Sequence, residues 1–175
     1  MTVELRVERQ SRSAEKLVGW LHGFLAEGGQ AGGKKEGEDG EAVRGVLGRV
    51  QHASLQTGDM QWLKEQMPGG YGPVFAIWMK SERLARRLPS KLELFHHATS
   101  LGGVESLIEW RTMSDTTVDT RLLWVSVGLE GWEDLREDFR RGLRALWEEE
   151  RESTRREEKE LSPGGEQREM KLAVR

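Results

Sequence analysis

The sequence predicts an α/β fold of the α+β type, in which a mainly antiparallel sheet of about four strands carries helices on one face. Apolar runs of strand length interleave with segments whose apolar residues recur at helical spacing. The chain has 175 residues, of which 36% are hydrophobic, with seven Trp and four Phe. That is enough apolar surface for one folded core and too little chain for two full domains.

The first quarter of the chain is predicted to hold an extended segment and one helix. Thr2–Val7 alternates apolar and polar residues, which predicts a short strand or an extended lead-in. Ser11 and Ser13 then precede an amphipathic helical pattern over residues 17–25, and either serine can cap that helix. Residues 28–41 are rich in Gly and charge. Because they hold almost no apolar surface to offset their ordering entropy, we expect a flexible insertion rather than a catalytic lid.

The middle of the chain predicts strands around one short helix. Residues 46–51 fit a strand, although the pattern there is ambiguous with a helix. Val74–Met79 is almost wholly apolar, which predicts a central strand covered on both faces. Ser81–Leu88 has a capping serine and is followed by Pro89, which predicts a short helix. Leu92–His96 is a further strand candidate.

The C-terminal half predicts the last three elements and a tail. Val104–Trp110 has the spacing of a short helix, and Leu122–Val127 that of a strand. A long amphipathic helix is predicted from Trp132 to about Glu150. We therefore expect one domain over residues 1–147. Residues 148–175 are charged and predict a tail, a solvated helix to about Glu160 followed by disorder.

Composition argues against several functions. Lys and Arg number 27 against 30 Asp and Glu, a net charge of -3, which does not favour nucleic-acid binding. Without cysteine there is no disulfide, thiolate zinc site or cysteine nucleophile. No apolar run has the length of a membrane span, so we expect a soluble cytoplasmic protein that does not bind membranes. His96 and His97 would point to opposite sides of a strand, which does not favour a metal site.

Two blocks carry chemically informative residues. Ser100–Ser106 reads S-L-G-G-V-E-S, and its paired glycines allow a tight turn beside a serine hydroxyl. Leu122–Glu130 reads L-L-W-V-S-V-G-L-E, and Ser126 and Gly128 lie two apart on the predicted strand. Such a small-residue face leaves room for a ligand or for a closely packed helix. From the residues alone, a purely structural role for the glycines is favoured.

These blocks resemble the C-terminal domain of the Cys/Met-metabolism family of pyridoxal-phosphate enzymes, which includes cystathionine γ-synthase, cystathionine γ- and β-lyases and methionine γ-lyase. Leu5–Gln10, His52–Leu55 and Gly69–Phe75 resemble further blocks of that domain. The resemblance covers most of residues 3–147. It implies the small-domain fold of fold-type I enzymes, pyridoxal 5'-phosphate as cofactor, elimination or replacement at a sulfur amino acid, and homo-oligomers.

The resemblance also implies a substrate-binding site. An arginine in the second block holds the substrate carboxylate in the family, and Trp124 stands at that position here. An indole donates one neutral hydrogen bond and carries no charge, so carboxylate binding is expected to be weakened. Arg121 is predicted to point to the other face of the strand. Ser100 is expected to face the site still, whereas Arg9 and the Gly69–Pro73 turn are secondary candidates with structural roles.

The coenzyme-binding residues of the family belong to a preceding domain. None of the eight lysines lies in a motif like the family's Ser-x-Thr-Lys. The resemblance therefore implies a C-terminal piece that is inactive alone and whose partner is the missing cofactor-binding domain or a full-length homologue, joined through an exposed apolar surface. An alternative is a non-catalytic interaction domain, or a truncated relative that associates with a full-length homologue. A third is a charged helical scaffold over Trp132–Glu160.

Overall fold

The structure is a computed structural model that describes residues 2–26 and 36–161. Its sheet has five strands in the order β1-β2-β5-β4-β3. The strands are β1 (Leu47–Gln51), β2 (Val74–Met79), β3 (His96–His97), β4 (Leu107–Trp110) and β5 (Leu122–Ser126). The helices are α1 (Val3–Leu25), α2 (Glu36–Val46), α3 (Met60–Gln66), α4 (Glu82–Arg87) and α5 (Trp132–Leu161). Short 3-10 turns occupy Ala53–Leu55, Leu88–Lys91 and Arg111–Met113.

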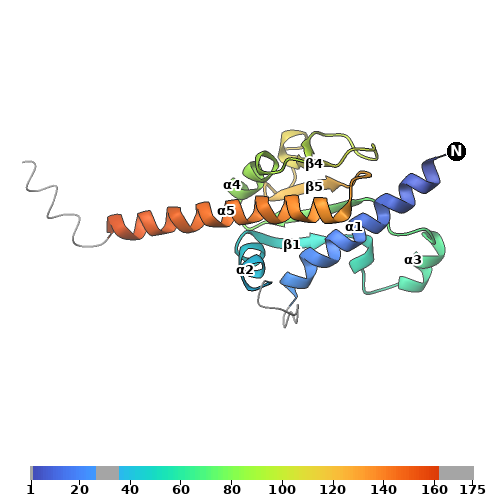
Figure 1. Cartoon of the computed structure of the whole chain (residues 1–175), viewed down its shortest axis with the longest axis horizontal. Helices are drawn as coiled ribbons and strands as arrows, with labels where there is room; N and C mark the ends of the chain where they lie inside the picture. The colour runs from blue at the N-terminus through green and yellow to red at the C-terminus, as the bar shows by residue number, and fades with distance from the viewer. Residues whose placement is uncertain (1, 27–35, 162–175) are drawn as a thin grey trace, which may run out of the picture.

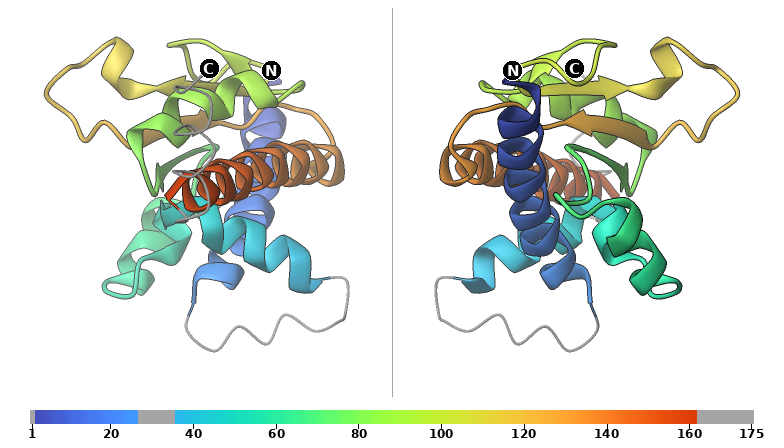
Figure 2. Two further views of the ribbon diagram at one scale, coloured as in Figure 1. Left: turned by 90° about the vertical axis from the view of Figure 1, so that its left-hand side faces the viewer. Right: turned by 90° about the vertical axis from the view of Figure 1, so that its right-hand side faces the viewer.

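The predicted fold class is confirmed. All neighbouring strands are antiparallel except β3 and β4, which are parallel. Helices α1, α2 and α5 lie in front of the sheet in Figure 1. In Figure 2, α1 crosses behind α5 in the left view and in front of α5 in the right view. The helical layer therefore covers one face of the sheet, as the sequence predicts.

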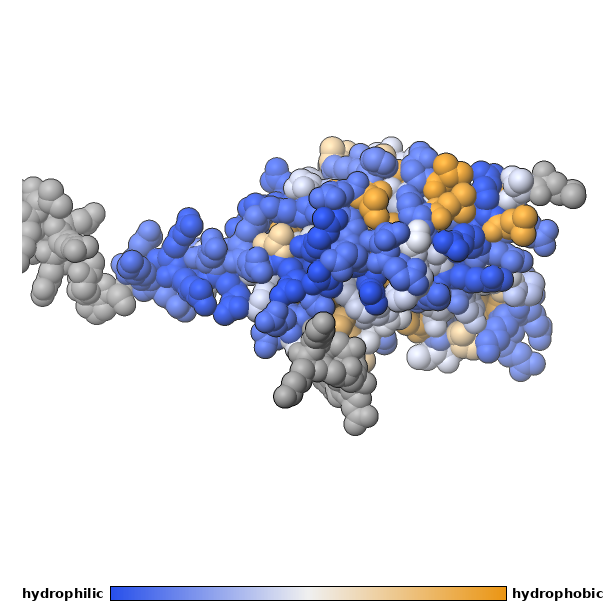
Figure 3. Space-filling view, viewed as in Figure 1, coloured by the Kyte–Doolittle hydropathy of each residue, from blue (hydrophilic) through white to orange (hydrophobic). Residues whose placement is uncertain are grey.

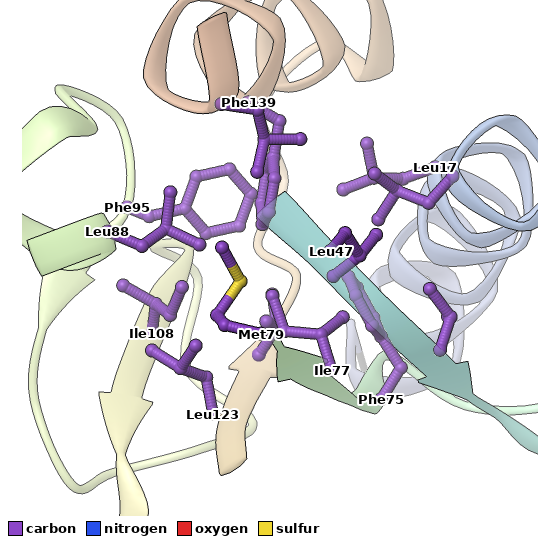
Figure 4. Close-up of a cluster of buried hydrophobic side chains, with 14 of the residues drawn as sticks. Leu17, Leu47, Phe75, Ile77, Met79, Leu88, Phe95, Ile108, Leu123 and Phe139 are labelled. Carbon is purple, nitrogen blue, oxygen red and sulfur yellow. The ribbon is translucent and has the colours of Figure 1, made fainter. Parts of the chain in front are cut away.

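The core lies between that helical layer and the sheet. Phe75 and Ile77 of β2 stand opposite Val125 and Leu123 of β5, and all four side chains are buried. Figure 4 shows side chains from these strands pointing toward Leu17 of α1 and Phe139 of α5. Burial of one whole face of β2 and β5 is what fixes their register, because a shift of one residue would expose every core side chain.

The other face of the sheet is not covered by helices. On β2, Val74, Ala76 and Trp78 are only half-buried, and Trp124 of β5 is 39% exposed. The prediction that Val74–Met79 is an interior strand of the sheet is confirmed, because β2 lies between β1 and β5. The prediction that both its faces are covered is wrong, because only one face of β2 is buried.

The beginning of the chain is helical rather than extended. Thr2–Val7, predicted as a strand, forms the first turns of α1, and Ser11 and Ser13 lie buried inside that helix instead of capping it. The apolar alternation was misleading because Val3 and Leu5 are exposed, at 62% and 69%. They contribute nothing to the core, and the helix is fixed further along by its buried residues.

Three other expectations are corrected. Residues 36–41 of the expected flexible insertion are the start of α2, whereas residues 27–35 lie outside the described residues. Val104–Trp110, predicted as a helix, contributes β4, because Leu107 and Ile108 pair with β5. Of the strand expected over Leu92–His96, only His96 lies in a strand, the two-residue β3. Residues 46–51, by contrast, give β1 almost as predicted.

Helix α5 continues past the domain. The predicted helix from Trp132 to Glu150 is confirmed, and the solvated helix expected to Glu160 is its direct extension, so residues 148–161 are helical; residues 162–175 lie outside the described residues. Glu149 pairs with Arg87 and Lys91, which holds the helix to α4 and its following turn. Beyond that contact the helix projects from the molecule (Figure 1). None of the helices described is long and apolar enough to cross a membrane.

Candidate functional site on the uncovered face of the sheet

The two sequence blocks interlock at one end of the sheet. Gly102, with φ 75°, donates its N–H to the Ser126 hydroxyl at 3.1 Å. Leu129 donates its N–H to the Val104 carbonyl at 2.8 Å. The positive φ at Gly102 is the turn that the paired glycines predict, since other residues adopt it at a cost.

The small-residue face of the second block is filled by the first block. Ser106 donates its backbone N–H and its hydroxyl to the two carboxylate oxygens of Glu130, both at 2.8 Å, and its oxygen accepts the Gly128 N–H at 2.9 Å. A Cβ at Gly128 would overlap the Val104 carbonyl oxygen and lie 2.5 Å from the Glu105 carbonyl carbon. The space beside Gly128 therefore holds chain, not a ligand, and the role of this glycine is structural.

Gln10 joins α1 to both blocks. Its side-chain amide donates to the Gly103 carbonyl at 2.6 Å and to the Val127 carbonyl at 3.0 Å, and the residue is 3% exposed. The buried Val127 carbonyl and the half-buried Gly103 carbonyl are thus each satisfied by a side chain 93 or more residues away in sequence. We call Gln10, Ser106, Gly128 and Glu130 the block junction.

The Gly69–Pro73 turn has the structural role expected of it. Gly70 packs against Ser11 of α1, where a Cβ would approach the serine Cβ to 2.7 Å, and the next N–H donates to Glu15 at 3.1 Å. His52 completes this attachment. Its Nε2 lies 3.1 Å from the Gly72 carbonyl oxygen, and burial is the main cause of a lowered pKa for its imidazole.

The uncovered face carries two indole and guanidinium pairs. Arg49 lies over the Trp78 ring at 4.6 Å, and Arg111 lies over the Trp124 ring at 4.1 Å. Trp124 stands opposite Ala76 in the register, so the two indoles are diagonal neighbours on adjacent strands. An open hollow of 760 Å³ runs along this face and includes Arg49, both indoles and His52 in its lining. We call this surface the open face.

A buried carboxylate holds Arg111 in place. Glu109 is the direct cross-strand neighbour of Trp124, and its side chain is 5% exposed. It accepts a hydrogen bond from Arg111 Nη1 at 2.9 Å and another from the Ser114 hydroxyl. This pairing satisfies the buried carboxylate and fixes the guanidinium above the indole.

The structure brings Ser100 and Trp124 together in one crevice. Both line a narrow space that is also bounded by Glu109, Leu107 and Ser126. Its volume of about 10 Å³ is room for one water molecule and not for an amino acid. Trp124 also lines the larger hollow of the open face, whereas Ser100 does not.

The other predicted residues lie apart from this crevice. Arg9 lines a separate hollow between α1 and the start of α5, together with Lys16 and Trp132. Arg121 lies just before β5, and its guanidinium hydrogen-bonds Asp119 at 2.7 and 3.0 Å, which lowers the pKa of that carboxyl to about 2. Arg121 is therefore already paired and does not replace the charge absent at Trp124.

Neither a metal site nor a coenzyme cradle is found in the described ranges 2–26 and 36–161. No three His, Asp or Glu side chains gather there to hold a metal ion. Lysines in those ranges do not line the hollow of the open face: Lys16 lies over Trp132, and Lys91 pairs with Glu149. The residues that line the open face thus do not fit a lysine-bound pyridoxal phosphate.

Four important residues were missed by the sequence reasoning. Ser106 and Glu130 are the last residues of the blocks Ser100–Ser106 and Leu122–Glu130. A serine and a carboxylate at these two positions could have predicted the hydrogen bonds between the blocks. Gln10 and Arg111 gave no local signal, because their partners lie far away in sequence or across a strand pair.

The fold and the site define a class of protein. It is a two-layer domain that has one uncovered sheet face and two glycine-containing blocks joined by hydrogen bonds. Residues 1–144 match the family described as Cys/Met metabolism PLP-dependent enzyme. The match spans most of the chain, so this protein belongs to that family, whose members use pyridoxal phosphate.

Solved structures agree with this fold. A methionine γ-lyase from Micromonospora echinospora is 27% identical, with a TM-score of 0.59 over 81% of this chain and 34% of its own. Cystathionine γ-lyase from yeast is 24% identical, with a TM-score of 0.61 over 81% of this chain and 35% of its own. A putative O-acetylhomoserine (thiol)-lyase from Campylobacter jejuni, which contains a pyridoxyl-lysine group, is 22% identical, with a TM-score of 0.59 over 81% and 29%. The chain spans about a third of the length of these structures.

Proposed function

We propose that this chain is the C-terminal, substrate-side domain of a trans-sulfuration enzyme resembling cystathionine γ-synthase or γ-lyase, and that it works with a coenzyme domain supplied by another polypeptide. The observation that carries the proposal is the open face. It leaves Trp78 and Trp124 uncovered in a domain whose other face is sealed by helices. A sheet face of this kind is completed by a further layer.

The coenzyme is assigned to the partner because this chain does not fit it. When bound, pyridoxal phosphate supplies an electron sink for elimination or replacement at a sulfur amino acid. Holding it takes a lysine inside a pocket, and the hollow of the open face is lined without one. Alone, the chain is therefore proposed to be inactive.

The chain's own contribution is binding and shielding. Trp124 lines the hollow with an apolar ring, which excludes water from a ligand lying against it. Ser100 offers a hydroxyl at the crevice beside that ring. Both residues are proposed as substrate-binding. The block junction joins the segment before β4 to the segment after β5 and so keeps these two strands in register.

The test is an association experiment with a truncated relative. The Micromonospora methionine γ-lyase, prepared without the third that this chain matches, is mixed with this chain and pyridoxal phosphate. We expect a stable complex by analytical ultracentrifugation and methionine elimination that neither component shows alone. The proposal is contradicted if no complex forms. It is also contradicted if this chain alone acquires the visible absorbance of bound coenzyme and turns over.

A second candidate is a non-catalytic interaction domain. It is favoured by the open face itself, since tryptophan and arginine are the residues that most often dominate protein interfaces. The Arg111 guanidinium over the Trp124 ring is paired with the Glu109 carboxylate, so this pair adds no net positive charge for a substrate anion. A complex that forms but gains no activity, even with Trp124→Arg, would favour this candidate over the first.

A further inference from the structure

We propose that the hollow between α1 and the start of α5 binds a small phosphate monoester. This α1–α5 hollow has a volume of about 590 Å³ and lies in the helical layer. Figure 1 shows α1 crossing the start of α5, and Figure 3, in the same view, shows mainly hydrophilic residues on this side of the molecule. The open face takes no part in the site, so the proposal does not rest on the proposed function.

A row of positive side chains on α1 lines the α1–α5 hollow. Arg9, Arg12 and Lys16 follow one another at spacings of three and four residues, so they lie on one face of the helix. Like charges at such spacing destabilise a helix. Arg12 is paired with Glu8 at 3.2 Å, whereas Arg9 and Lys16 form no ion pair with any residue in the described ranges. A bound anion would neutralise the two unpaired charges.

The indole of Trp132, the first residue of α5, positions one of these charges. Lys16 Nζ lies 5.1 Å from the centroid of the Trp132 ring, and both residues line the hollow. A cation over an indole face is attracted to the ring, which restrains the flexible lysine side chain beside the hollow. Such restraint reduces the entropy that is lost when the ammonium pairs with an anion.

Two neutral donors accompany the charges. The Nε1 atom of Trp132 is buried, and no group in the described part of the chain accepts its hydrogen bond. Ser13, which is 4% exposed, adds a hydroxyl to the lining. A phosphate monoester carries up to two charges and directs its oxygens several ways, so it can accept from an ammonium, a guanidinium and an N–H together. A planar carboxylate has only two oxygens, which favours phosphate as the ligand.

Two carboxylates also line the hollow. Glu15 is directed to the Gly69–Pro73 turn, where its Oε1 accepts the Tyr71 N–H at 3.1 Å. Glu133 is exposed in the first turn of α5, and in the described ranges it is paired with none of the cations of the hollow. The charge of Glu133 opposes an anion in the hollow. Its removal should therefore strengthen the binding of an anion.

The experiment is a titration of ¹⁵N-labelled chain at constant ionic strength, followed at the indole N–H resonance that is lost in Trp132→Phe. The probes are glycerol 3-phosphate and glycerol, which differ in the phosphate group alone. At about pH 8 the monoester is a dianion, since its second pKa is about 6. We expect glycerol 3-phosphate to shift the resonance and glycerol not to. Arg9→Gln and Lys16→Gln should each bind it about tenfold more weakly, as expected for the loss of a charge-assisted hydrogen bond, and Glu133→Gln should bind it more tightly.

Arg136→Gln is the matched control. The Arg136 guanidinium lies over the same ring at the same 5.1 Å as Lys16, but it does not line the hollow. Its loss should weaken binding by less than about threefold. The proposal is overturned if glycerol 3-phosphate acts no differently from glycerol, or if Arg9→Gln and Lys16→Gln bind as the parent chain does. It is also overturned if Arg136→Gln weakens binding as much as Lys16→Gln, or if Glu133→Gln weakens it.

Discussion

The two faces of β5 differ in what occupies them. Leu123 and Val125 are fully buried against the helices, whereas Trp124 between them is 39% exposed. The strand ends in Ser126, whose hydroxyl accepts a hydrogen bond from the first block. One face and both ends of the strand are thus buried in the fold, and on the other face the Trp124 ring is left for a partner or ligand. Family resemblance in such a strand does not by itself separate the two uses, because residues of both kinds lie within the same block.

The largest expected effect is at the block junction. Gly128→Val would drive its side chain into the backbone at Val104 and Glu105, which cannot move without separating the blocks. We expect a loss of unfolding free energy of about 3 kcal/mol or more in chemical denaturation. Gly58→Ala is the control, since its Cβ would have no neighbour within 4 Å and should change stability little. Equal effects at the two glycines would contradict the structural role of Gly128.

A smaller loss is expected when the junction is kept but one hydrogen-bonding group is removed. Ser106→Ala leaves the Gly128 N–H and one Glu130 oxygen without their partner in a buried site. The expected cost is about 1–3 kcal/mol by chemical denaturation. Ser90→Ala removes a hydroxyl that is exposed and donates to the Arg87 carbonyl, and it should cost less than about 0.5 kcal/mol. A Ser106→Ala protein as stable as the parent would show that the junction does not stabilise the fold.

His52 should give stability a pH dependence. Burial lowers its pKa below the ordinary 6.5, so the folded state binds fewer protons than the unfolded state. Its contribution is therefore complete above pH 6.5 and is lost as the pH falls below that value, at up to about 1.4 kcal/mol per pH unit. The slope of unfolding free energy between pH 6.5 and 5 should be shallower in His52→Gln. A His52→Gln slope equal to the parent's would contradict the assignment.

The smallest effect on stability is expected on the open face. Trp124→Arg replaces a partly exposed ring, so the unfolding free energy should change by less than about 1 kcal/mol. In the complex with the truncated methionine γ-lyase, the new guanidinium should raise kcat/KM for methionine, because a charge-assisted pair with the carboxylate is gained. An unchanged kcat/KM would contradict the proposal that substrate binds beside position 124.

Local patterns predicted the elements whose own residues are buried. Residues 132–150 were predicted because their apolar spacing matches the face that they bury, and Val74–Met79 was predicted because its apolar run has the length of a strand. The strand predicted over Thr2–Val7 was wrong because the exposed Val3 and Leu5 form no core face, so their alternation carried no information. The helix predicted over residues 104–110 was wrong because β4 is stabilised by pairing with β5, which a local sequence pattern does not indicate.

The candidate site was predicted in part for the same reason. Ser100 and Trp124 could be grouped because both lie in recognisable blocks, and the structure places them on one crevice. Arg111 could not be added, because it reaches Trp124 through the register of two strands and the 3-10 turn that follows β4. The uncovered face was missed because an apolar run such as Val74–Met79 reads the same whether the second layer belongs to this chain or to a partner.

The double variant Trp78→Ala/Trp124→Ala tests most directly whether the open face serves association rather than folding. Its unfolding free energy and its affinity for the truncated methionine γ-lyase are measured together. The account predicts a folded domain that loses much less stability than Gly128→Val and binds the truncated enzyme at least tenfold more weakly, as expected for removal of two interface tryptophans. Parent-like affinity, or a loss of stability as large as that of Gly128→Val, would contradict it.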